Sequence, residues 1–403
     1  MTAQHTPDAK AIGGHFLNAQ RLSVYPIIFL AVYVLAALLW VSQSTDMLDP
    51  RDKPLGYDFI TFWSGANLAI DGNPADVFDA AKMSAAQTLA VPGNQKLYLW
   101  HYPPTFLLMI LPLAAIPYLW AYLIWGVGTF LAFASVIRKM APQPQTMVLL
   151  LAFPASFVNM MQGQNAFLTA FLFGGALMNL ERKPVLAGIL IGMLSYKPHL
   201  GLLIPLALVC GRHWITFAAA AATTIGLALV SAAALGTEVW IAFFDNLPVV
   251  RGVLDNQLIS WTKFQSLYAT LRLAGAGIGV AYGAQIVLSI AVAVAVGIIW
   301  WRRPALPLRA AVLVAGSLLA TPYVFNYDLA LLAIPIALLA MDGYVRGWLP
   351  AEREILALAW LMPLVTVGVA ETTHLQIGSL CIGALFFAAI RRAHGSIGAI
   401  PQR

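Results

Sequence analysis

The sequence has few charged residues for its size. They make up 10% of the 403 residues, whereas 60% are hydrophobic, and an average soluble domain carries about 25% charged residues. The mean hydropathy is correspondingly high, at +0.79. This composition excludes a soluble globular enzyme.

Cysteines, long basic runs and common catalytic motifs are also scarce or absent. The two cysteines, Cys210 and Cys381, lie in or beside apolar segments, which excludes a disulfide scaffold and a cysteine-rich metal site. No basic run exceeds two residues, so the net charge of +6 does not indicate a nucleic-acid partner. The motifs of phosphate-binding loops, dinucleotide folds, zinc peptidases and serine hydrolases are missing. We therefore expect no cofactor and no metal site.

Long apolar segments take the place of these features. Residues 214–233 and 277–300 carry no charge, and each has the length of about 20 residues that crosses a hydrocarbon core. A polar stretch, residues 1–22, precedes the apolar segment Val24–Val41, which is too long for the hydrophobic part of a signal peptide and lacks a convincing cleavage site. The sequence predicts an all-α, polytopic membrane protein whose first span is retained.

Basic clusters recur between the apolar segments and mark one side of the membrane, because cytoplasmic loops are enriched in Lys and Arg. With the chain ends, this side holds 15 of the 23 basic residues and five acidic ones, a net charge of +10. The other side holds eight basic and 12 acidic residues, a net charge of −4. The clusters are Arg138-Lys139, Arg182-Lys183, Arg212, Arg302-Arg303 with Arg309, Arg346 with Arg353, and Arg391-Arg392.

This asymmetry predicts a multi-pass protein of a bacterial-type inner membrane. We expect one membrane domain over residues 1–403, with about twelve spans and both termini in the cytoplasm. Residues 1–22 and 392–403 form the cytoplasmic tails in this prediction. Residues 42–103 form a long first external loop with amphipathic interfacial helices, and residues 234–276 form a second large external loop.

Two segments do not fit simple spans. Residues 104–116 contain prolines and are predicted to form a half-embedded helix, with residues 118–137 as the crossing that follows. Residues 184–210 lie between two cytoplasmic clusters, so we expect two short arms that meet at residues 196–199. Non-helical backbone at that depth is tolerated only where it lines a cavity, which makes this tip a candidate site.

Asp58 begins an apolar segment in the first external loop that is predicted to be an amphipathic helix on the membrane surface. One interpretation is a helix cap, in which the carboxylate accepts backbone N–H bonds. The other is a general base close to aromatic residues such as Tyr57 and Trp63, placed to take a proton from an acceptor hydroxyl. The two interpretations are compatible.

Lys197 lies in the middle of an otherwise apolar segment of 27 residues. An ammonium at that position is costly and indicates a function, usually together with a partner. An anionic headgroup would supply such a partner. The alternative is that the side chain extends to the interface without a functional role.

Other polar residues of the predicted external side are weaker candidates. His101 and Tyr102 lie where the first loop returns to the membrane, and Gln164 and Asn165 form a turn whose amides suit sugar hydroxyls. Arg272, with Lys263 and Arg251, extends the positive surface or forms a solvated helix face. Asp328 is predicted to be either a cap or a second acid beside the cavity.

Six segments between residue 56 and about residue 336 read, in order, GYDFITFWSGANLAIDGNPADVFDA, YPPTFLLMILPLAAIP, QGQNAFLTAFLF, LAGILIGMLSYKPHLGLLIPLALV, QSLYATLRLAG and TPYVFNYDLALLAIP. This series resembles glycosyltransferase family 87, in the GT-C superfamily of polyprenyl-phosphate-dependent transferases. The aspartate that family members carry in the first external loop matches Asp58. Their lysine-proline element matches Lys197-Pro198, followed here by His199, where glutamine is frequent.

The resemblance implies an inverting, mannosyltransferase-like enzyme with a GT-C-like fold. It would move a hexose or pentose from a polyprenyl-phosphate donor to a glycolipid or glycan acceptor on the external face. Asp58 would be the catalytic base, and Lys197, Arg272 and Lys263 would bind the donor phosphate. The candidate substrate-binding residues are Tyr57, Trp63, His101, Tyr102, Gln164, Asn165, His199, Gln265, Asn326, Tyr327 and Asp328.

A transporter or lipid flippase is the main alternative, since it would also have many spans, broken helices and intramembrane charge. Such proteins usually show internal pseudo-symmetry, which this sequence lacks. A structural subunit of an envelope-polysaccharide assembly is a third possibility.

Overall fold

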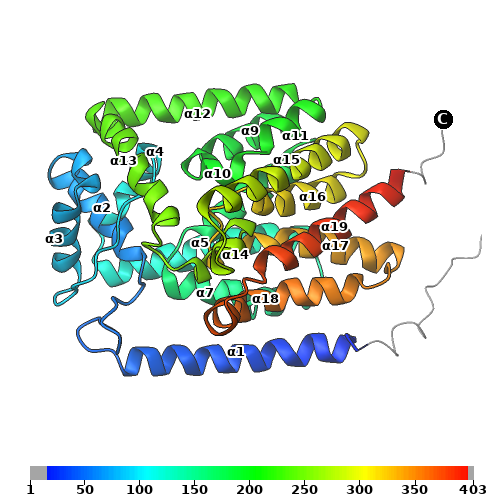
Figure 1. The fold of residues 1–403 in the computed structure, drawn as a ribbon, viewed down its shortest axis with the longest axis horizontal. Helices are drawn as coiled ribbons and strands as arrows, with labels where there is room; N and C mark the ends of the chain where they lie inside the picture. The colour runs from blue at the N-terminus through cyan, green and yellow to red at the C-terminus, as the bar shows by residue number, and fades with distance from the viewer. Residues whose placement is uncertain (1–15, 398–403) are drawn as a thin grey trace, which may run out of the picture.

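The structure is a computed structural model, and it describes residues 16–397. Among these residues it is all helical, without a strand. Figure 1 shows the described ends of the first and last helices at the right of the view, and the helices of the first external loop at the opposite end. The fold class predicted from the sequence is therefore confirmed at the level of an all-α, polytopic membrane protein.

Within residues 16–397, six helical segments are long and apolar enough to cross a membrane. They are α1 (Ala19–Ser42), α5 (Tyr118–Met140), α12 (Trp214–Leu235), α15 (Ile278–Arg302), η6 (Asn326–Leu332) continued by α17 (Ala333–Arg346), and α18 (Glu352–Thr373).

Five shorter apolar helical segments lie between them. They are α4 (Pro104–Ile110) with η3 (Leu111–Ala115), α8 (Ala166–Asn179), α9 (Pro184–Met193) with η4 (Leu194–Tyr196), α10 (Pro198–Gly201) with α11 (Ile204–Cys210), and α16 (Leu306–Leu319). The expectation of about twelve crossings stays a prediction.

The remaining helices lie in the predicted external regions, beside the short apolar segments, or at the end of the chain. They are α2 (Phe59–Asp71), η2 (Pro74–Phe78), α3 (Ala80–Ala90), α6 (Thr146–Leu151), α7 (Pro154–Gln162), α13 (Glu238–Asp255), η5 (Trp261–Lys263), α14 (Leu267–Leu273) and α19 (Gly378–Ile397).

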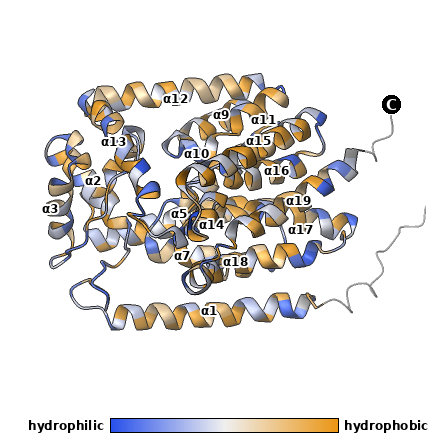
Figure 2. Cartoon of the chain, in the orientation of Figure 1, coloured by the Kyte–Doolittle hydropathy of each residue, from blue (hydrophilic) through white to orange (hydrophobic). Residues whose placement is uncertain are grey.

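The outer helices α1 and α12 turn apolar side chains away from the protein. Only 11% of the most apolar window of each is buried, and Figure 2 shows hydrophobic residues along both helices. Buried α16 is the opposite case, with nearly every side chain from Leu308 to Leu319 enclosed. Lipid tails are as apolar as the exposed side chains of α1 and α12, so this exposure is expected for helices that face lipid.

Helix α9 packs closely on α12 through two glycines one turn apart. A Cβ atom added to Gly188 would lie 2.6 Å from the carbonyl oxygen of Thr216, and one added to Gly192 would lie 2.9 Å from that of Ala220. Small residues at this spacing let membrane helices approach each other. This contact fixes the first of the two short arms against a full-length helix.

The two arms expected over residues 184–210 are present. The helical path ends at Tyr196, Lys197 takes φ −125° and ψ 66°, and Pro198 begins the next helix. Proline is favourable in the first turn of a helix and disfavours helical backbone in the residue before it. The break therefore follows directly from the Lys197-Pro198 sequence.

The prediction for α2 needs correction. We expected its apolar face to lie on the membrane surface, but Phe59, Ile60 and Phe62 are at most 1% exposed and belong to the main hydrophobic core. Helices α3, α4, α5 and the 3-10 helices η2 and η3 pack around α2. The pattern of apolar residues predicted the buried face correctly, but this face is covered by protein.

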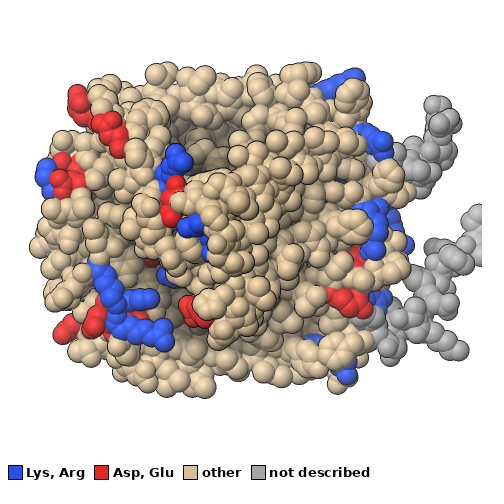
Figure 3. Space-filling model, in the orientation of Figure 1, with Lys and Arg blue, Asp and Glu red and all other residues tan. Residues whose placement is uncertain are grey.

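Charged side chains at the right-hand end of the molecule are predominantly basic in Figure 3. Ion pairs also lie in this predicted cytoplasmic region. Arg392 forms buried pairs with Asp342, at 2.6 Å, and with Glu352. Arg309, itself buried, contacts the exposed carboxylate of Glu181 at 2.5 Å. The charges that were assigned to one side by sequence thus gather at one end of the fold.

Labelling of single cysteines tests the predicted orientation. In a background with both native cysteines replaced by serine, Lys82→Cys in α3 should react with a membrane-impermeant maleimide added to intact cells. Arg182→Cys, in a predicted cytoplasmic loop, should react only after the cells are opened, because both positions are exposed but lie on opposite sides in the prediction. Strong labelling of Arg182→Cys in intact cells would contradict the topology.

Candidate active site

Asp58 directly precedes α2, but its side chain makes no capping hydrogen bond. The Nε2 atom of Gln164 instead donates to Asp58 Oδ2 at 2.9 Å. The contact is possible because Gly163, with φ +60°, ends α7 in a left-handed turn that packs on the Gly56 carbonyl and on Phe59. Only glycine takes this conformation without a steric penalty, and no Cβ would fit there. The capping interpretation of the Asp58 carboxylate is therefore not supported by its contacts.

Gln164 also connects Asp58 to Tyr102. The Tyr102 hydroxyl donates to Gln164 Oε1 at 3.2 Å, so the two ends of one buried amide hold residues from two different segments. Burial, followed by the negative charges of Asp328 and Asp58, raises the pKa of Tyr102 well above its usual value. Tyr102 therefore lies within electrostatic reach of both carboxylates.

Lys197 and Asp328 form a buried ion pair. Lys197 Nζ lies 2.6 Å from Asp328 Oδ1, and the two side chains are 3% and 1% exposed. The other carboxylate oxygen of Asp328 accepts the N–H of Phe325 at 3.1 Å, and Lys197 Nζ lies 5.1 Å from the centre of the Tyr327 ring. The capping alternative for Asp328 agrees with its contact to Phe325, and its role as a second acid beside a cavity stays a prediction.

This pair corrects the prediction for Lys197. We expected an ammonium without a protein partner, which a donor phosphate would complete, but the partner is Asp328. The contact joins residues 131 positions apart, so the sequence around Lys197 gives no sign of it. An unpaired ammonium at this position would still be costly, and here the carboxylate of Asp328 neutralises its charge.

The electrostatic environment of Asp58 contains two lysines. Burial raises the pKa of the Asp58 carboxyl, and this increase is opposed by the Gln164 hydrogen bond and by the charges of Lys263 and Lys53. Burial, followed by the charges of Lys263 and Lys96, lowers the pKa of Lys53. Lys53 and exposed Lys263 thus form a small positive region beside the carboxylate.

Lys53 was missed by the sequence analysis. Lys53 belongs to the predicted first external loop and Lys263 to the predicted second one. The two residues are 210 positions apart in the sequence. The only sequence signal was the presence of basic residues in an otherwise acidic loop. Proximity of the two loops is a tertiary property that no local pattern reports.

Several predicted substrate-binding residues have buried polar atoms without a protein partner in the described part of the chain. Leaving such atoms unsatisfied costs about 1–3 kcal/mol each, so they are suited to bind water or substrate hydroxyls. Burial also lowers the pKa of His101 to about 4, which keeps its ring neutral. The atoms are His101 Nδ1, Asn165 Nδ2 and Oδ1, His199 Nε2, and Gln265 Oε1.

Two late segments are joined to this region by the backbone. The Gln265 N–H donates to the Val324 carbonyl at 2.7 Å, next to a short bridge between Phe264 and Phe325. Asn326 and Tyr327, both buried, follow directly in η6. Residues 264–265 and the turn at residues 324–327 therefore lie next to each other.

Three predicted site residues make contacts that serve the fold. The Tyr57 hydroxyl donates to Asp49 Oδ2 at 2.8 Å, and Trp63 Nε1 donates to the Ile116 carbonyl at 2.8 Å. Arg272 donates to the Ala276 carbonyl at 2.8 Å and stacks on Trp261, 4.4 Å from the ring centre. None of these contacts involves Asp58 or Lys197. The geometry therefore gives no support for a direct role of the three residues in substrate binding.

The described residues contain no group of three or more His, Cys, Asp or Glu side chains arranged to hold a metal ion. The candidate site consists of one carboxylate held by an amide, a buried lysine–aspartate pair, and Lys53 and Lys263. Six helices of the described residues are long and apolar enough to cross a membrane, so this polar cluster belongs to an integral membrane protein.

The family model of glycosyltransferase family 87 matches residues 100–322. This range covers more than half of the chain, and the chain belongs to this family. It is therefore a membrane glycosyltransferase, which favours an enzyme over a transporter or flippase. Neither a search of curated proteins nor a search of solved structures found a match to the chain.

The matched range includes most of the candidate site. Tyr102, Gln164, Lys197 and Lys263 lie inside it, whereas Asp58 and Asp328 lie outside it. The family assignment therefore does not itself identify the carboxylates. Their importance depends on the contacts that they make with Gln164 and Lys197.

The ion pair predicts a large stability effect for a single substitution. Lys197→Met should lower the free energy of unfolding by about 3–5 kcal/mol, because Asp328 would remain buried without its partner. Adding Asp328→Asn should recover much of this loss, since no buried charge is then left. Denaturation in mixed micelles would measure both variants.

Lys183→Met is a matched control for this experiment. It removes an exposed lysine from the start of the same arm and should change stability by no more than about 0.5 kcal/mol. Equal stability of Lys197→Met and wild type would show that the pair contributes nothing to the fold.

Proposed function

We propose that this protein is an inverting glycosyltransferase that moves a sugar from a polyprenyl-phosphate donor to a hydroxyl of a glycolipid or glycan on the external face of a bacterial-type inner membrane. The observation that supports this proposal best is the Asp58 carboxylate, which is not used as a helix cap and is oriented by Gln164. Family membership supplies the reaction class. The sugar in this proposal is a mannose-like hexose or a pentose.

In the proposed reaction, Asp58 takes the proton of the acceptor hydroxyl. The acceptor oxygen attacks the anomeric carbon, and a new glycosidic C–O bond forms while the bond from that carbon to the phosphate oxygen breaks. The electron pair of the broken bond leaves with the lipid phosphate. One displacement of this kind inverts the anomeric configuration.

Burial of Asp58 suits the role of a base. Its pKa is raised by burial, and a general base works best when its pKa lies nearer the working pH than that of an ordinary carboxylate. Gln164 donates to one carboxylate oxygen and fixes its direction. The other oxygen then has lone pairs that can accept the acceptor proton.

We assign the donor phosphate to Lys263 and Lys53. The charges of both lysines lower the pKa of Asp58, and Lys263 is exposed. A cation aimed at the oxygen that gains charge stabilises the leaving phosphate. Lys197, already paired with Asp328, acts in this proposal as a positioning residue that holds the tip of the two arms beside Tyr327.

Asp58→Asn tests the base directly. Asparagine retains an oxygen that accepts the Gln164 amide N–H, so the melting temperature should stay close to that of wild type. Sugar transfer should fall by about 10²- to 10⁴-fold, because an amide cannot accept the proton. Both quantities would be measured on the purified variant in nanodiscs with a polyprenyl-phosphate donor.

Asp79→Asn is the matched control. Asp79 is an exposed N-cap whose Oδ1 accepts the N–H groups of Ala81 and Lys82, so its replacement should leave transfer unchanged. Transfer by Asp58→Asn within about threefold of wild type, far from the expected 10²-fold loss, would rule out Asp58 as the base.

The pH dependence gives a second test. Activity should be lost as the pH falls through the raised pKa of Asp58, because the protonated carboxyl cannot act as a base. Gln164→Ala and Lys263→Gln each remove an interaction that lowers this pKa. Both should move the acidic limb of kcat/KM to higher pH, with Lys263→Gln also raising the KM for the donor by about tenfold.

Gln162→Ala serves as the control for the pH profiles. It removes an amide two residues away at the end of α7, and its acidic limb should coincide with that of wild type. An acidic limb that stays in place in both site variants would mean that it reports a group other than Asp58.

A further inference from the structure

A polar pocket lies far from Asp58, at the end of the molecule that is predicted to be cytoplasmic. Three loops converge there: the α8–α9 loop with Glu181, the α11–α12 loop with Arg212 and His213, and the α15–α16 loop with Arg303. The pocket has a volume of about 430 Å³. All three loops belong to the side that the charge pattern predicts to be cytoplasmic, so this pocket is separate from the Asp58 site.

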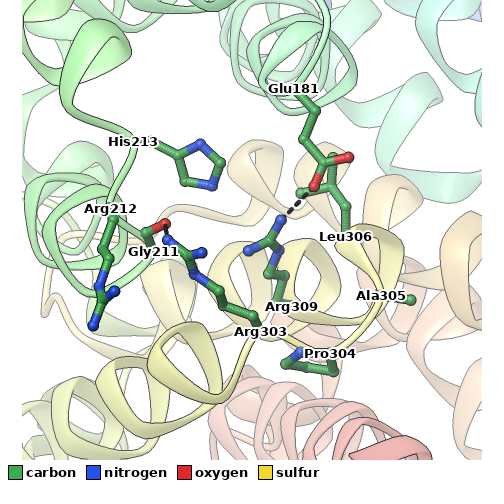
Figure 4. Close-up of a pocket in the computed structure, with 9 residues that line it drawn as sticks. All are labelled: Glu181, Gly211, Arg212, His213, Arg303, Pro304, Ala305, Leu306 and Arg309. Carbon is green, nitrogen blue, oxygen red and sulfur yellow. Dashed lines mark hydrogen bonds and ion pairs between the residues drawn. The ribbon is translucent and has the colours of Figure 1, made fainter. Parts of the chain in front are cut away.

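The lining is positively charged. It holds three arginines, Arg212, Arg303 and Arg309, against one acidic residue, Glu181. Figure 4 shows the side chains of Arg303, Arg309 and His213 around a common space, whereas the side chain of Arg212 points away from it. One carboxylate cannot neutralise the guanidinium groups that face the pocket.

Protein contacts hold both arginines in place. Arg303 donates to the Gly211 carbonyl at 2.5 Å, and Arg309 donates to Glu181 Oε1 at 2.5 Å. The Arg309 guanidinium also stacks over Trp300, 5.1 Å from the ring centre. Groups that are already ordered lose less conformational freedom when they bind a ligand.

Two donors in this pocket have no partner in the described part of the chain. Arg309 is only 5% exposed, and its Nε atom makes no hydrogen bond. His213 Nε2 is also buried without a partner. Burial, followed by the charge of Arg309, lowers the pKa of His213; Arg303 acts in the same direction and Glu181 opposes it. The net charge around His213 is therefore positive, and binding of an anion there is favourable.

We propose that this pocket binds a phosphate-bearing anion. Arg303 and Arg309 hold the phosphate oxygens, and neutral His213 donates one further hydrogen bond. The planar guanidinium fork matches phosphate oxygens in geometry and charge. Basic pockets between membrane helices on the cytoplasmic side suit anionic lipid headgroups, and a free phosphate offers the same chemistry. The inference does not rest on the transfer reaction.

The experiment compares two ligands on the full-length protein. In one arm, inorganic phosphate is titrated against chloride at equal ionic strength, in nanodiscs of phosphatidylcholine. In the other arm, phosphatidylglycerol is added to the nanodiscs and no phosphate is present. The melting temperature of wild type should rise in at least one arm, and the arm that responds identifies the source of the phosphate group.

Two variants locate the effect in the pocket. Arg303→Gln should weaken the apparent affinity by about tenfold, the loss expected for one charge-assisted hydrogen bond. Ala305→Asp places a carboxylate in the lining at the N-cap of α16, where aspartate favours the helix. This variant keeps every native donor and should abolish the response, so it decides the outcome if Arg303→Gln folds poorly.

Arg182→Gln is the matched control. It removes one exposed positive charge from the loop that carries Glu181 but does not line the pocket, and it should respond like wild type. The proposal is overturned if neither ligand stabilises the wild type. It is equally overturned if Ala305→Asp responds normally or if Arg182→Gln loses the response.

Discussion

The buried ion pair between Lys197 and Asp328 is the contact on which the arrangement of the site depends. In a membrane, two arms can meet at a break only where the freed polar groups are satisfied by protein or by water in a cavity. At this break the Lys197 N–H bonds to the Leu194 carbonyl at 2.9 Å, and Asp328 accepts a hydrogen bond from the Lys197 ammonium. Asp328 also accepts the N–H of Phe325. Phe325 in turn pairs with Phe264. The Asp328 carboxylate thereby links the break at Lys197 with the turn at Phe325. Through Phe264 it is also connected to the predicted second external loop.

The same pair explains how a basic and an acidic side chain can both be buried at the tip of the arms. Removing one partner of a buried pair leaves an uncompensated charge, which is strongly destabilising. The pair therefore specifies which segments meet more than it adds net stability. Tyr327 lies beside it, and Tyr102 is within electrostatic reach of Asp328 and Asp58. The position of the candidate base relative to the tip of the arms follows from this set of contacts.

Features set by local sequence were predictable. Pro198 predicted the break, and the alternation of apolar stretches and basic clusters predicted the all-α membrane class. The resemblance to the family came from six short segments in a fixed order. Contacts between distant segments were not predictable. The partner of Lys197, the role of Lys53 and the burial of the α2 face by protein all depend on segments far apart in the chain. The phosphate-binding role of Arg272 stays a prediction, and in the structure its guanidinium stacks on Trp261.

The two ends of the molecule use different cations, and the chemistry of each residue suits the role proposed for it. Lys53 and Lys263 stand near Asp58 as compact, strongly hydrated charges on flexible stems. Such charges can stabilise a leaving phosphate and still release the product. Arg303 and Arg309 are held by Gly211, Glu181 and Trp300 before any ligand arrives. Ordered guanidinium groups of this kind favour a bound anion that stays, because little freedom is lost on binding and the geometry is bidentate. A site that must release its product would therefore use lysines, and a site that keeps its ligand would use arginines. In this proposal the two kinds of site lie at opposite ends of one membrane protein.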